Sequence, residues 1–191
     1  MLEGLLDWDK KALIFLNGLG SESYDSFWSL VTNIGTWTPL FILFFLLIMS
    51  QYRRKEGLII SLCIIFLLLV THLITDLSKD FFERLRPNND LELNGIIRVL
   101  RQPESFSFFS GHASTSFAVT TLVVLFLRKN RAWFALLFFW PMLFSLSRIY
   151  VGVHFPLDLL AGALVGTLLA FIFYRGYKRF IEPYSASARP L

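Results

Sequence analysis

Long apolar runs alternate with short charged segments along this chain. A helix needs about 20 predominantly apolar residues to cross a bilayer. Runs of this kind end at clusters of Lys and Arg, such as residues 53–55. The pattern therefore predicts five membrane-spanning helices, at about 26–50, 57–77, 110–129, 132–146 and 156–174.

The N-terminal segment differs from these runs. Residues 5–18 mix apolar side chains such as Leu13 and Phe15 with two aspartates and two lysines. A short, charged segment of this kind is typical of an amphipathic helix that lies at the membrane interface. We therefore predict an interfacial helix within residues 1–22. The alternative is a sixth helix that partly spans the bilayer.

Composition also indicates a bilayer rather than water as the surrounding solvent. Hydrophobic residues make up 55% of the 191 residues and charged residues 17%, with a mean hydropathy of +0.58. Soluble domains carry about 25% charged residues. The net charge is +4, but the cations stand in short clusters between apolar runs, which is typical of membrane topology and not of nucleic-acid binding. The sequence thus predicts one all-α, polytopic membrane domain over residues 1–191, with no obligatory protein partner evident.

The basic clusters predict the orientation of the helices. With five spans, the segments at 51–56, 128–131 and 175–179 share one side, and each carries three Lys or Arg. The positive-inside rule places such segments in the cytoplasm. We therefore expect a protein of the bacterial inner (plasma) membrane with a cytoplasmic tail at 175–191. The loop at 78–109 would face the periplasm or exterior.

Three groups of polar residues stand at span ends on that outer side, and the first contains Lys79, Arg86 and Pro87. A spacing of seven residues is about two helical turns, so both cations would lie on one helix face. Pro87 disfavours helix at Arg86 and marks the expected helix end. Two such cations suit an anion with several oxygens. The alternative is a solvated helix end in which Lys79 pairs with Glu83.

The second group is Ser110, Gly111 and His112, directly before the third apolar run. Ser is a good helix N-cap, Gly lets the backbone approach a ligand closely, and a helix N-terminus attracts anions. His112 would then stand in the first turn, where it could donate or accept a proton. The alternative is a capped helix with an interfacial histidine.

The third group comprises Ser147, Arg148, His154 and Asp158. Pro156 suits the first position of a helix, so Asp158 would fall in the first turn, near His154. A carboxylate there can bind the N–H of one imidazole nitrogen and leave the other nitrogen free as a nucleophile. The alternative is an ion pair or cap at the membrane interface, although charges within a membrane are costly and often functional.

Together the three groups predict one site on one face of the membrane. They supply cations, anion-binding backbone, two histidines and a carboxylate, but no ligand cluster suited to Mg²⁺ or Zn²⁺. This combination favours phosphoryl transfer through a phosphohistidine, without a metal or another cofactor. His72 and Asp76, one turn apart in the second run, are expected to pack inside the bundle; the alternative is that they steer the cations of the site.

These spacings resemble the signature of the type-2 phosphatidic acid phosphatase (PAP2) superfamily, which reads K-x6-R-P, then P-S-G-H, then S-R-x5-H-x3-D. The chain carries Lys79-x6-Arg86-Pro87, Phe109-Ser110-Gly111-His112 and Ser147-Arg148-x5-His154-x3-Asp158. Only the leading proline of the second part differs. Phe109 stands in its place, which changes the stiffness of the loop but removes no catalytic group. The match covers residues 79–158.

The resemblance implies a PAP2/haloperoxidase-like helical core and a role for each matching residue. His154 would attack phosphorus, Asp158 would orient His154, and His112 would protonate the leaving oxygen and later activate water. The residues that would hold the phosphate oxygens are Lys79, Arg86, Ser110, Gly111 and Arg148.

The resemblance also implies a class of substrate, a lipid that carries a phosphate monoester or a pyrophosphate. Undecaprenyl pyrophosphate is the first expectation, and phosphatidylglycerophosphate, phosphatidic acid and lipid A phosphates are alternatives. Vanadium haloperoxidases share this type of site, but they resemble large soluble proteins. The alternative outside enzymes is a transporter or a catalytically inactive lipid-binding protein. A transporter is expected to show broken spans or paired repeats, and neither is evident in the sequence.

Overall fold

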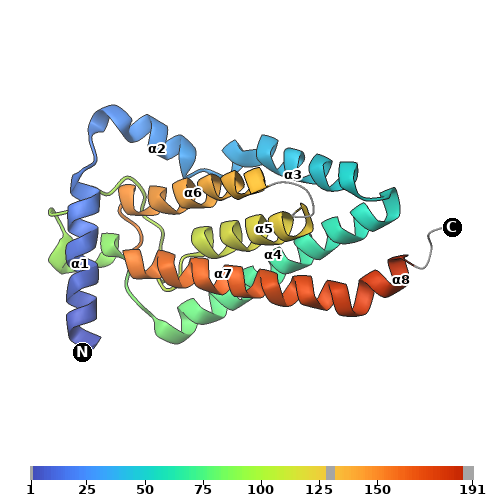
Figure 1. Ribbon diagram of the computed structural model, residues 1–191. Helices are drawn as coiled ribbons and strands as arrows, with labels where there is room; N and C mark the ends of the chain where they lie inside the picture. The colour runs from blue at the N-terminus through green and yellow to red at the C-terminus, as the bar shows by residue number, and fades with distance from the viewer. Residues whose placement is uncertain (1, 128–131, 187–191) are drawn as a thin grey trace.

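Five helices run lengthwise beside one another and form the body of the protein (Figure 1). The computed structural model describes residues 2–127 and 132–186, and no β-strand occurs in this part of the chain. The all-α fold predicted from the sequence is confirmed. The lengthwise helices are α3 (Thr38–Gln51), α4 (Arg54–Phe82), α5 (Gly111–Leu127), α6 (Phe139–Tyr150) and α7 (Pro156–Gly176).

Shorter elements flank this body. Three are α-helices: α1 (Leu2–Gly18), α2 (Asp25–Val31) and α8 (Glu182–Ala186). Five are 3-10 turns: η1 (Glu22–Tyr24), η2 (Ile34–Trp37), η3 (Pro87–Asn89), η4 (Leu91–Leu93) and η5 (Ala132–Phe138). The element η6 (Tyr177–Ile181) is a π-helical turn that joins α7 to α8.

The bundle exposes large apolar side chains along its outer helices. On α4, Leu62, Phe66 and Leu69 are each 60% or more exposed. Contiguous apolar surface of this kind is rare on soluble monomers. Three helical stretches are long and apolar enough to cross a membrane, Ile34–Gln51, Arg54–Leu93 and Pro156–Tyr184, and two shorter ones are also apolar, Gly111–Leu127 and Ala135–Tyr150. The chain is therefore an integral membrane protein. Each predicted span includes one of the five lengthwise helices, and the number of helices that cross the membrane stays a prediction.

Two predicted spans begin or end elsewhere in the structure. The run at 26–50 is broken, because Asn33 accepts a hydrogen bond from the Gly35 amide and turns the chain between α2 and η2. Helix α4 continues past residue 77 to Phe82, where Glu83 adopts a left-handed conformation (φ 45°) and stops it. The predicted loop at 78–109 is therefore shorter by one helical turn.

The last two spans also have different limits. The run at 132–146 begins with the 3-10 turn η5, and α6 then extends to Tyr150. Helix α7 does not stop at residue 174 but continues through η6 into α8. Residues 175–186 of the predicted tail are consequently helical. The predicted loop at 128–131 lies outside the described residues.

Helix α5 is the centre of the bundle: most of its residues are buried and the rest are half-buried. It touches α7 through backbone at two glycines. A Cβ atom added to Gly166 would lie 2.0 Å from the carbonyl oxygen of Ser114, and one added to Gly162 would lie 2.6 Å from that of Ser110. Small residues allow membrane helices to approach this closely. The contact brings the beginnings of α5 and α7 together.

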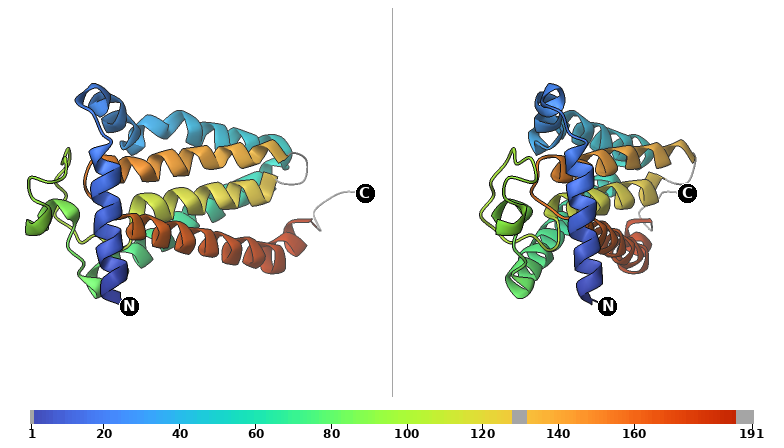
Figure 2. Two further views of the ribbon diagram at one scale, coloured as in Figure 1. Left: turned by 60° about the vertical axis from the view of Figure 1, so that its left-hand side comes forward. Right: turned by 90° about the vertical axis from the view of Figure 1, so that its left-hand side faces the viewer.

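Helix α1 runs across one end of the bundle rather than alongside its helices, and the loop between α4 and α5 lies at the same end (Figures 1 and 2). The Asn17 side chain donates to the carbonyl oxygens of Arg98 and Ile149, and Arg98 pairs with Asp25 at 2.6 Å. These contacts tie α1, α2 and the loop to α6. The basic residues 53–55 and α8 lie at the opposite end. The position of α1 in the membrane interface stays a prediction.

Candidate active site

His154 and Asp158 stand at the beginning of α7. Pro156 starts the helix, and the carboxylate Oδ2 of Asp158 accepts a hydrogen bond from the Phe155 amide at 2.9 Å. The same oxygen lies 3.2 Å from Nδ1 of His154. Since an ionised carboxylate only accepts hydrogen bonds, this contact places the imidazole proton on Nδ1.

The other imidazole nitrogen faces Arg86. Nη1 of Arg86 lies 3.0 Å from Nε2 of His154, and a guanidinium only donates, so Nε2 presents a lone pair. Burial lowers the pKa of His154 to about 4, although the hydrogen bond with Asp158 favours the protonated form. The ring is therefore neutral at neutral pH, with its lone pair directed toward a cation.

Arg86 reaches this position from the loop after α4. Because α4 ends at Phe82, Lys79 and Arg86 do not share a helix face, and that prediction is wrong. The left-handed Glu83 reverses the chain instead. Arg86 is then fixed by Ser105, whose carbonyl oxygen accepts from Nε at 2.5 Å and whose hydroxyl oxygen accepts from Nη2 at 3.0 Å.

His112 and Arg148 meet at Thr32, in the break between α2 and η2. Nη1 of Arg148 donates to the Thr32 hydroxyl oxygen at 2.6 Å, and Nε2 of His112 lies 3.3 Å from the Thr32 carbonyl oxygen. The His112 ring also stacks on Phe144 at 4.6 Å between centroids. Arg148 lies in the last turn of α6, not after it. Its buried Nε has no hydrogen-bond partner among the described residues, which leaves a donor for an anion.

These groups lie close to one another. Arg148, His154 and Arg86 all lie close enough to His112 to interact with it electrostatically. Gly111 is the first residue of α5, and Ser110 precedes it as the cap, since its hydroxyl oxygen accepts from the Ala113 amide at 3.4 Å. The first amides of a helix have no partner within the helix. Two cations, two histidines and a helix N-terminus therefore converge.

Lys79 lies in the last turn of α4, and no contact joins its side chain to the other predicted site residues in the described part of the chain. Its ammonium group forms an ion pair with Asp76 at 3.5 Å, and its side chain is 16% exposed. Asp76 also lies 3.3 Å from His72, whose side chain is 71% exposed. The expectation that His72 and Asp76 pack inside the bundle is wrong, because both lie on its outer surface. The contact between Asp76 and Lys79 agrees with the alternative, a role in placing a cation.

Several neighbours of the site were missed by the sequence analysis. Arg84 donates to Oδ1 of Asp158 and to Oδ2 of Asp9, at 2.6 Å in each case. The hydroxyl of Ser107 donates to Oδ2 of Asp158. Arg84 lies inside the interval of the first motif, so its position was a usable signal. Asp9 and Thr32 are distant in sequence, and no spacing could have linked them to the site.

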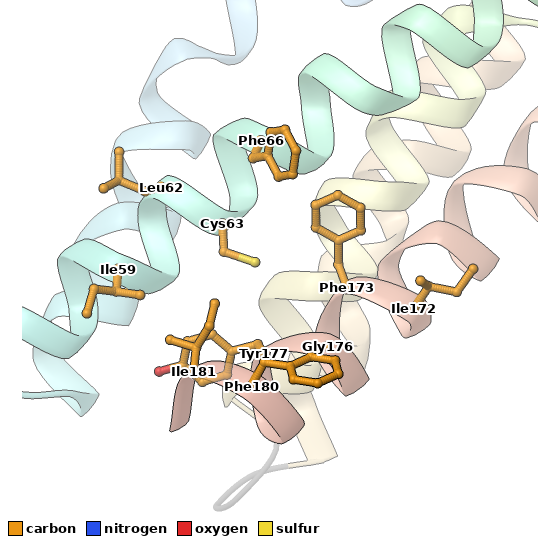
Figure 3. A pocket seen from close by; sticks show the side chains of 10 residues that line it. All are labelled: Ile59, Leu62, Cys63, Phe66, Ile172, Phe173, Gly176, Tyr177, Phe180 and Ile181. Atoms are coloured by element: carbon orange, nitrogen blue, oxygen red, sulfur yellow. The ribbon is translucent and has the colours of Figure 1, made fainter. Parts of the chain in front are cut away.

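Two apolar grooves of the bundle contain none of the predicted site residues. One, of about 220 Å³, lies between α3, α4 and α5, and its floor includes Val119, about 10 Å along α5 from His112. The other, of about 500 Å³, lies between α4 and the end of α7, toward the end of the bundle that carries α8 (Figure 3). Its lining is mostly apolar, and it contains Cys63 but none of the predicted site residues. A third apolar groove, of about 300 Å³, lies between α5, α6 and the beginning of α7. Its lining includes Ile149 and Leu159, the residues next to Arg148 and Asp158, so this groove begins beside the polar site.

The described residues do not include a group of side chains suited to a metal ion. Among the described residues, no three His, Cys, Asp or Glu side chains form a group that could hold a metal ion. Phe109, which replaces the proline of the motif, is buried beside Phe108. A metal-independent reaction stays a prediction.

Comparison with known proteins gives consistent matches. The profile of the PAP2 superfamily matches residues 60–182. A lipid A 4'-phosphatase of Bacteroides thetaiotaomicron is 29% identical over 91% of this chain and 79% of its own length. An undecaprenyl-diphosphatase of Sulfolobus acidocaldarius is 34% identical over 71% of this chain and 61% of its own length.

Two solved structures share the fold. A PAP2-type phosphatidylglycerolphosphate phosphatase from Bacillus subtilis superposes with a TM-score of 0.71 at 22% identity, covering 93% of this chain and 88% of that one. LpxE of Aquifex aeolicus superposes with a TM-score of 0.70 at 28% identity, covering 86% of this chain and 93% of that one.

Proposed function

The chain belongs to the PAP2 superfamily, and from this membership and the site geometry we propose that it removes phosphate from a membrane lipid through a phosphohistidine on His154. That it is a membrane lipid phosphatase follows from the family and the fold. The roles of individual residues and the identity of the lipid are the proposal. The observation that carries it is the placement of His154, with Nδ1 held by Asp158 and Nε2 directed toward Arg86.

In the first step, Nε2 of His154 attacks phosphorus. The N–P bond forms as the bond from phosphorus to the leaving oxygen breaks, and His112 gives its proton to that oxygen. The imidazole ring of His154 becomes positive, and the Asp158 carboxylate at Nδ1 stabilises that charge. Arg86 must exchange its contact with Nε2 for a phosphate oxygen, so substrate binding itself uncovers the nucleophile.

In the second step, water replaces His154 on phosphorus. His112, now neutral, accepts a proton from the attacking water, the N–P bond breaks, and inorganic phosphate leaves. His154 returns to its neutral form and His112 to its acid form. One histidine thus serves as nucleophile and the other as acid and then base, and no further reactant besides water is needed.

Cations and backbone amides stabilise the charge of the phosphoryl group. Arg148 offers its unpaired Nε, Arg86 its Nη1, and Lys79 an ammonium group. Ser110 and Gly111 place the N-terminus of α5 beside the phosphate, where the helix favours an anion. Fixed donors of this kind replace the metal ion that many phosphatases use.

For the lipid, the relatives support a phosphate monoester of the lipid A type as the first candidate. Two lipid A 4'-phosphatases, from Bacteroides thetaiotaomicron and Porphyromonas gingivalis, align over more than nine-tenths of this chain, at 29% and 26% identity. The sequence analysis had placed undecaprenyl pyrophosphate first. That lipid remains the second candidate, since an undecaprenyl-diphosphatase is 34% identical over a shorter stretch.

Two apolar grooves suit the hydrocarbon chains of such a lipid, the one between α3, α4 and α5 and the one between α5, α6 and α7. The first is lined by Phe41, Phe45 and Leu68, among others, and the second includes Pro156 at the beginning of α7. The basic residues 53–55 at the opposite end support an orientation with the site on the outer face of a bacterial inner membrane. The substrate would then be a lipid of the outer leaflet.

The experiment that tests the function is a phosphate-release panel on the purified protein in detergent. The panel contains lipid A, undecaprenyl pyrophosphate, phosphatidylglycerophosphate and phosphatidic acid, and each product is identified by mass spectrometry. We expect the highest kcat/KM for lipid A, with loss of one phosphate. A clear preference for undecaprenyl pyrophosphate would select the second candidate, and no release from any lipid would contradict the function.

A further inference from the structure

The catalytic carboxylate has a second set of partners on the side away from His154. Oδ2 of Asp158 binds His154, the Phe155 amide and the Ser107 hydroxyl. Oδ1 accepts from Nη1 of Arg84 at 2.6 Å. Both oxygens are thus engaged, and the carboxylate has no exposed surface.

Arg84 is itself held by a residue of α1. Its Nη2 donates to Oδ2 of Asp9 at 2.6 Å, and its guanidinium carbon lies 4.0 Å from the centroid of the Phe155 ring. The other oxygen of Asp9 accepts from the Leu157 amide at 2.9 Å. Asp9 is fully buried, although it belongs to a helix that crosses the end of the bundle. Burial raises the pKa of Asp9, but both of its partners are donors, which suits the carboxylate form.

The charges of this network matter for the phosphohistidine. A guanidinium paired with Asp158 alone would cancel the charge that the His154 imidazolium needs. With Asp9 present, two carboxylates share one guanidinium, and one net negative charge remains beside the ring. A buried pair of carboxylates without Arg84 would be costly, so each of the three groups requires the others.

We propose that Asp9 and Arg84 are positioning residues for the reaction, acting through Asp158. Arg84 fixes the carboxylate so that Oδ2 faces Nδ1 of His154, and Asp9 fixes Arg84 and offsets its charge. This inference rests on the proposed function of His154 and Asp158. It makes α1 a part of the catalytic apparatus and not only a membrane-surface element.

A double-mutant cycle tests this assignment, with purified full-length protein and lipid A as the substrate probe, or the panel lipid with the highest kcat/KM where lipid A is not cleaved. Asp9→Asn is expected to lower kcat about tenfold or more while KM stays within about threefold, because the phosphate-binding cations are untouched. In an Asp158→Asn background the same change is expected to cost less than about twofold, since the group through which Asp9 acts is already altered. Equal losses in both backgrounds would overturn the positioning role.

Asp7→Asn is the matched control, because Asp7 lies two residues away on α1 and forms an exposed ion pair with Lys11. It is expected to leave kcat unchanged. Where Asp9→Asn proves unstable, Arg84→Lys carries the same cycle, since an ammonium group keeps the charge but cannot grip two carboxylates as a fork. A wild-type protein that releases no phosphate from any lipid of the panel would contradict the proposed function instead.

Discussion

Nη1 of Arg86 lies 3.0 Å from Nε2 of His154, so the nitrogen proposed as the nucleophile is covered by one of the cations expected to bind the phosphate. This contact assigns the roles of the two ring nitrogens. It also places the residue that must bind the phosphoryl group within one hydrogen bond of the atom that attacks it.

The nucleophile itself gives the first prediction. His154→Ala is expected to reduce phosphate release at least about 10³-fold, because no other side chain can replace the attacking nitrogen. Asp158→Asn is expected to cost less, about 10²-fold or more, since Asp158 orients the ring and does not bond to phosphorus. Steady-state phosphate release measures both. Retention of more than a few per cent of wild-type turnover by His154→Ala would remove His154 as the nucleophile.

The pH dependence follows from the pKa of His154. Burial lowers that pKa to about 4, so the ring stays neutral and nucleophilic from neutral pH down to about that value. Protonation below it removes the Nε2 lone pair. The rate of phosphoenzyme formation in single-turnover experiments is therefore expected to fall as the pH drops through about 4. A midpoint near 6.5, the ordinary value for histidine, would contradict the effect of burial; circular dichroism at each pH verifies folding.

Metal dependence is the third prediction. Activity is expected to survive EDTA, because Arg86, Arg148 and the N-terminus of α5 supply the positive charge. Vanadate is expected to inhibit, since it adopts the five-coordinate geometry of the transition state that these groups bind. Phosphate release with EDTA and with increasing vanadate measures both. Activity lost in EDTA and restored by Mg²⁺ would mean that the mechanism is wrong.

Topology is the fourth prediction, and it determines which leaflet supplies the substrate. The segment between α4 and α5, which contains Asn94, lies at the end of the bundle crossed by α1, and the first turn of α4, which contains Lys55, lies at the other end (Figure 1). Both residues are exposed. In a Cys63→Ser background, Asn94→Cys is expected to react with an impermeant thiol reagent on intact cells, and Lys55→Cys is expected to stay protected. The reverse pattern would place the site in the cytoplasm.

The fifth prediction concerns the contact between α5 and α7. Gly166→Ala is expected to destabilise the protein by about 1–3 kcal/mol, because the added Cβ would overlap the Ser114 carbonyl oxygen. Gly176→Ala is the matched control, since nothing lies within 4 Å of its added Cβ and alanine favours helix. Thermal unfolding in detergent is expected to show a lower Tm for the first variant and an unchanged or higher Tm for the second. Equal shifts would contradict the close backbone contact.

Long apolar runs and basic clusters were sufficient to predict the helical bundle, because a spanning helix requires about 20 predominantly apolar residues in succession. They could not predict the break at Asn33 or the left-handed Glu83, since each depends on one local turn within an apolar or helical run. Lys79 and Arg86 were predicted to share a helix face because a spacing of seven residues fits two helical turns. The turn at Glu83 ends the helix between them, so Arg86 lies in a loop.

The spacing of the motifs predicted that His154 and Asp158 lie close together, because both are within one helical turn of Pro156. It could not bring Asp9 or Thr32 to the site. Their contacts join segments 75 and 116 residues apart, through Arg84 and Arg148. Contacts of that range depend on how α1 and α2 fold over the end of the bundle. A local sequence pattern does not predict that arrangement.

The backbone contact at Gly162 and Gly166 restricts which residues of this protein can be substituted. It fixes the spacing of the two helices that carry the histidines, so neither helix can shift without main-chain collision. The groove between α3, α4 and α5 is instead lined by side chains such as Phe41, Phe45 and Leu68. Because the proposal places lipid chains there, we expect substitutions in this lining to change which lipid is accepted while the spacing of the two histidines is retained, and selection for new substrates in the laboratory would target it.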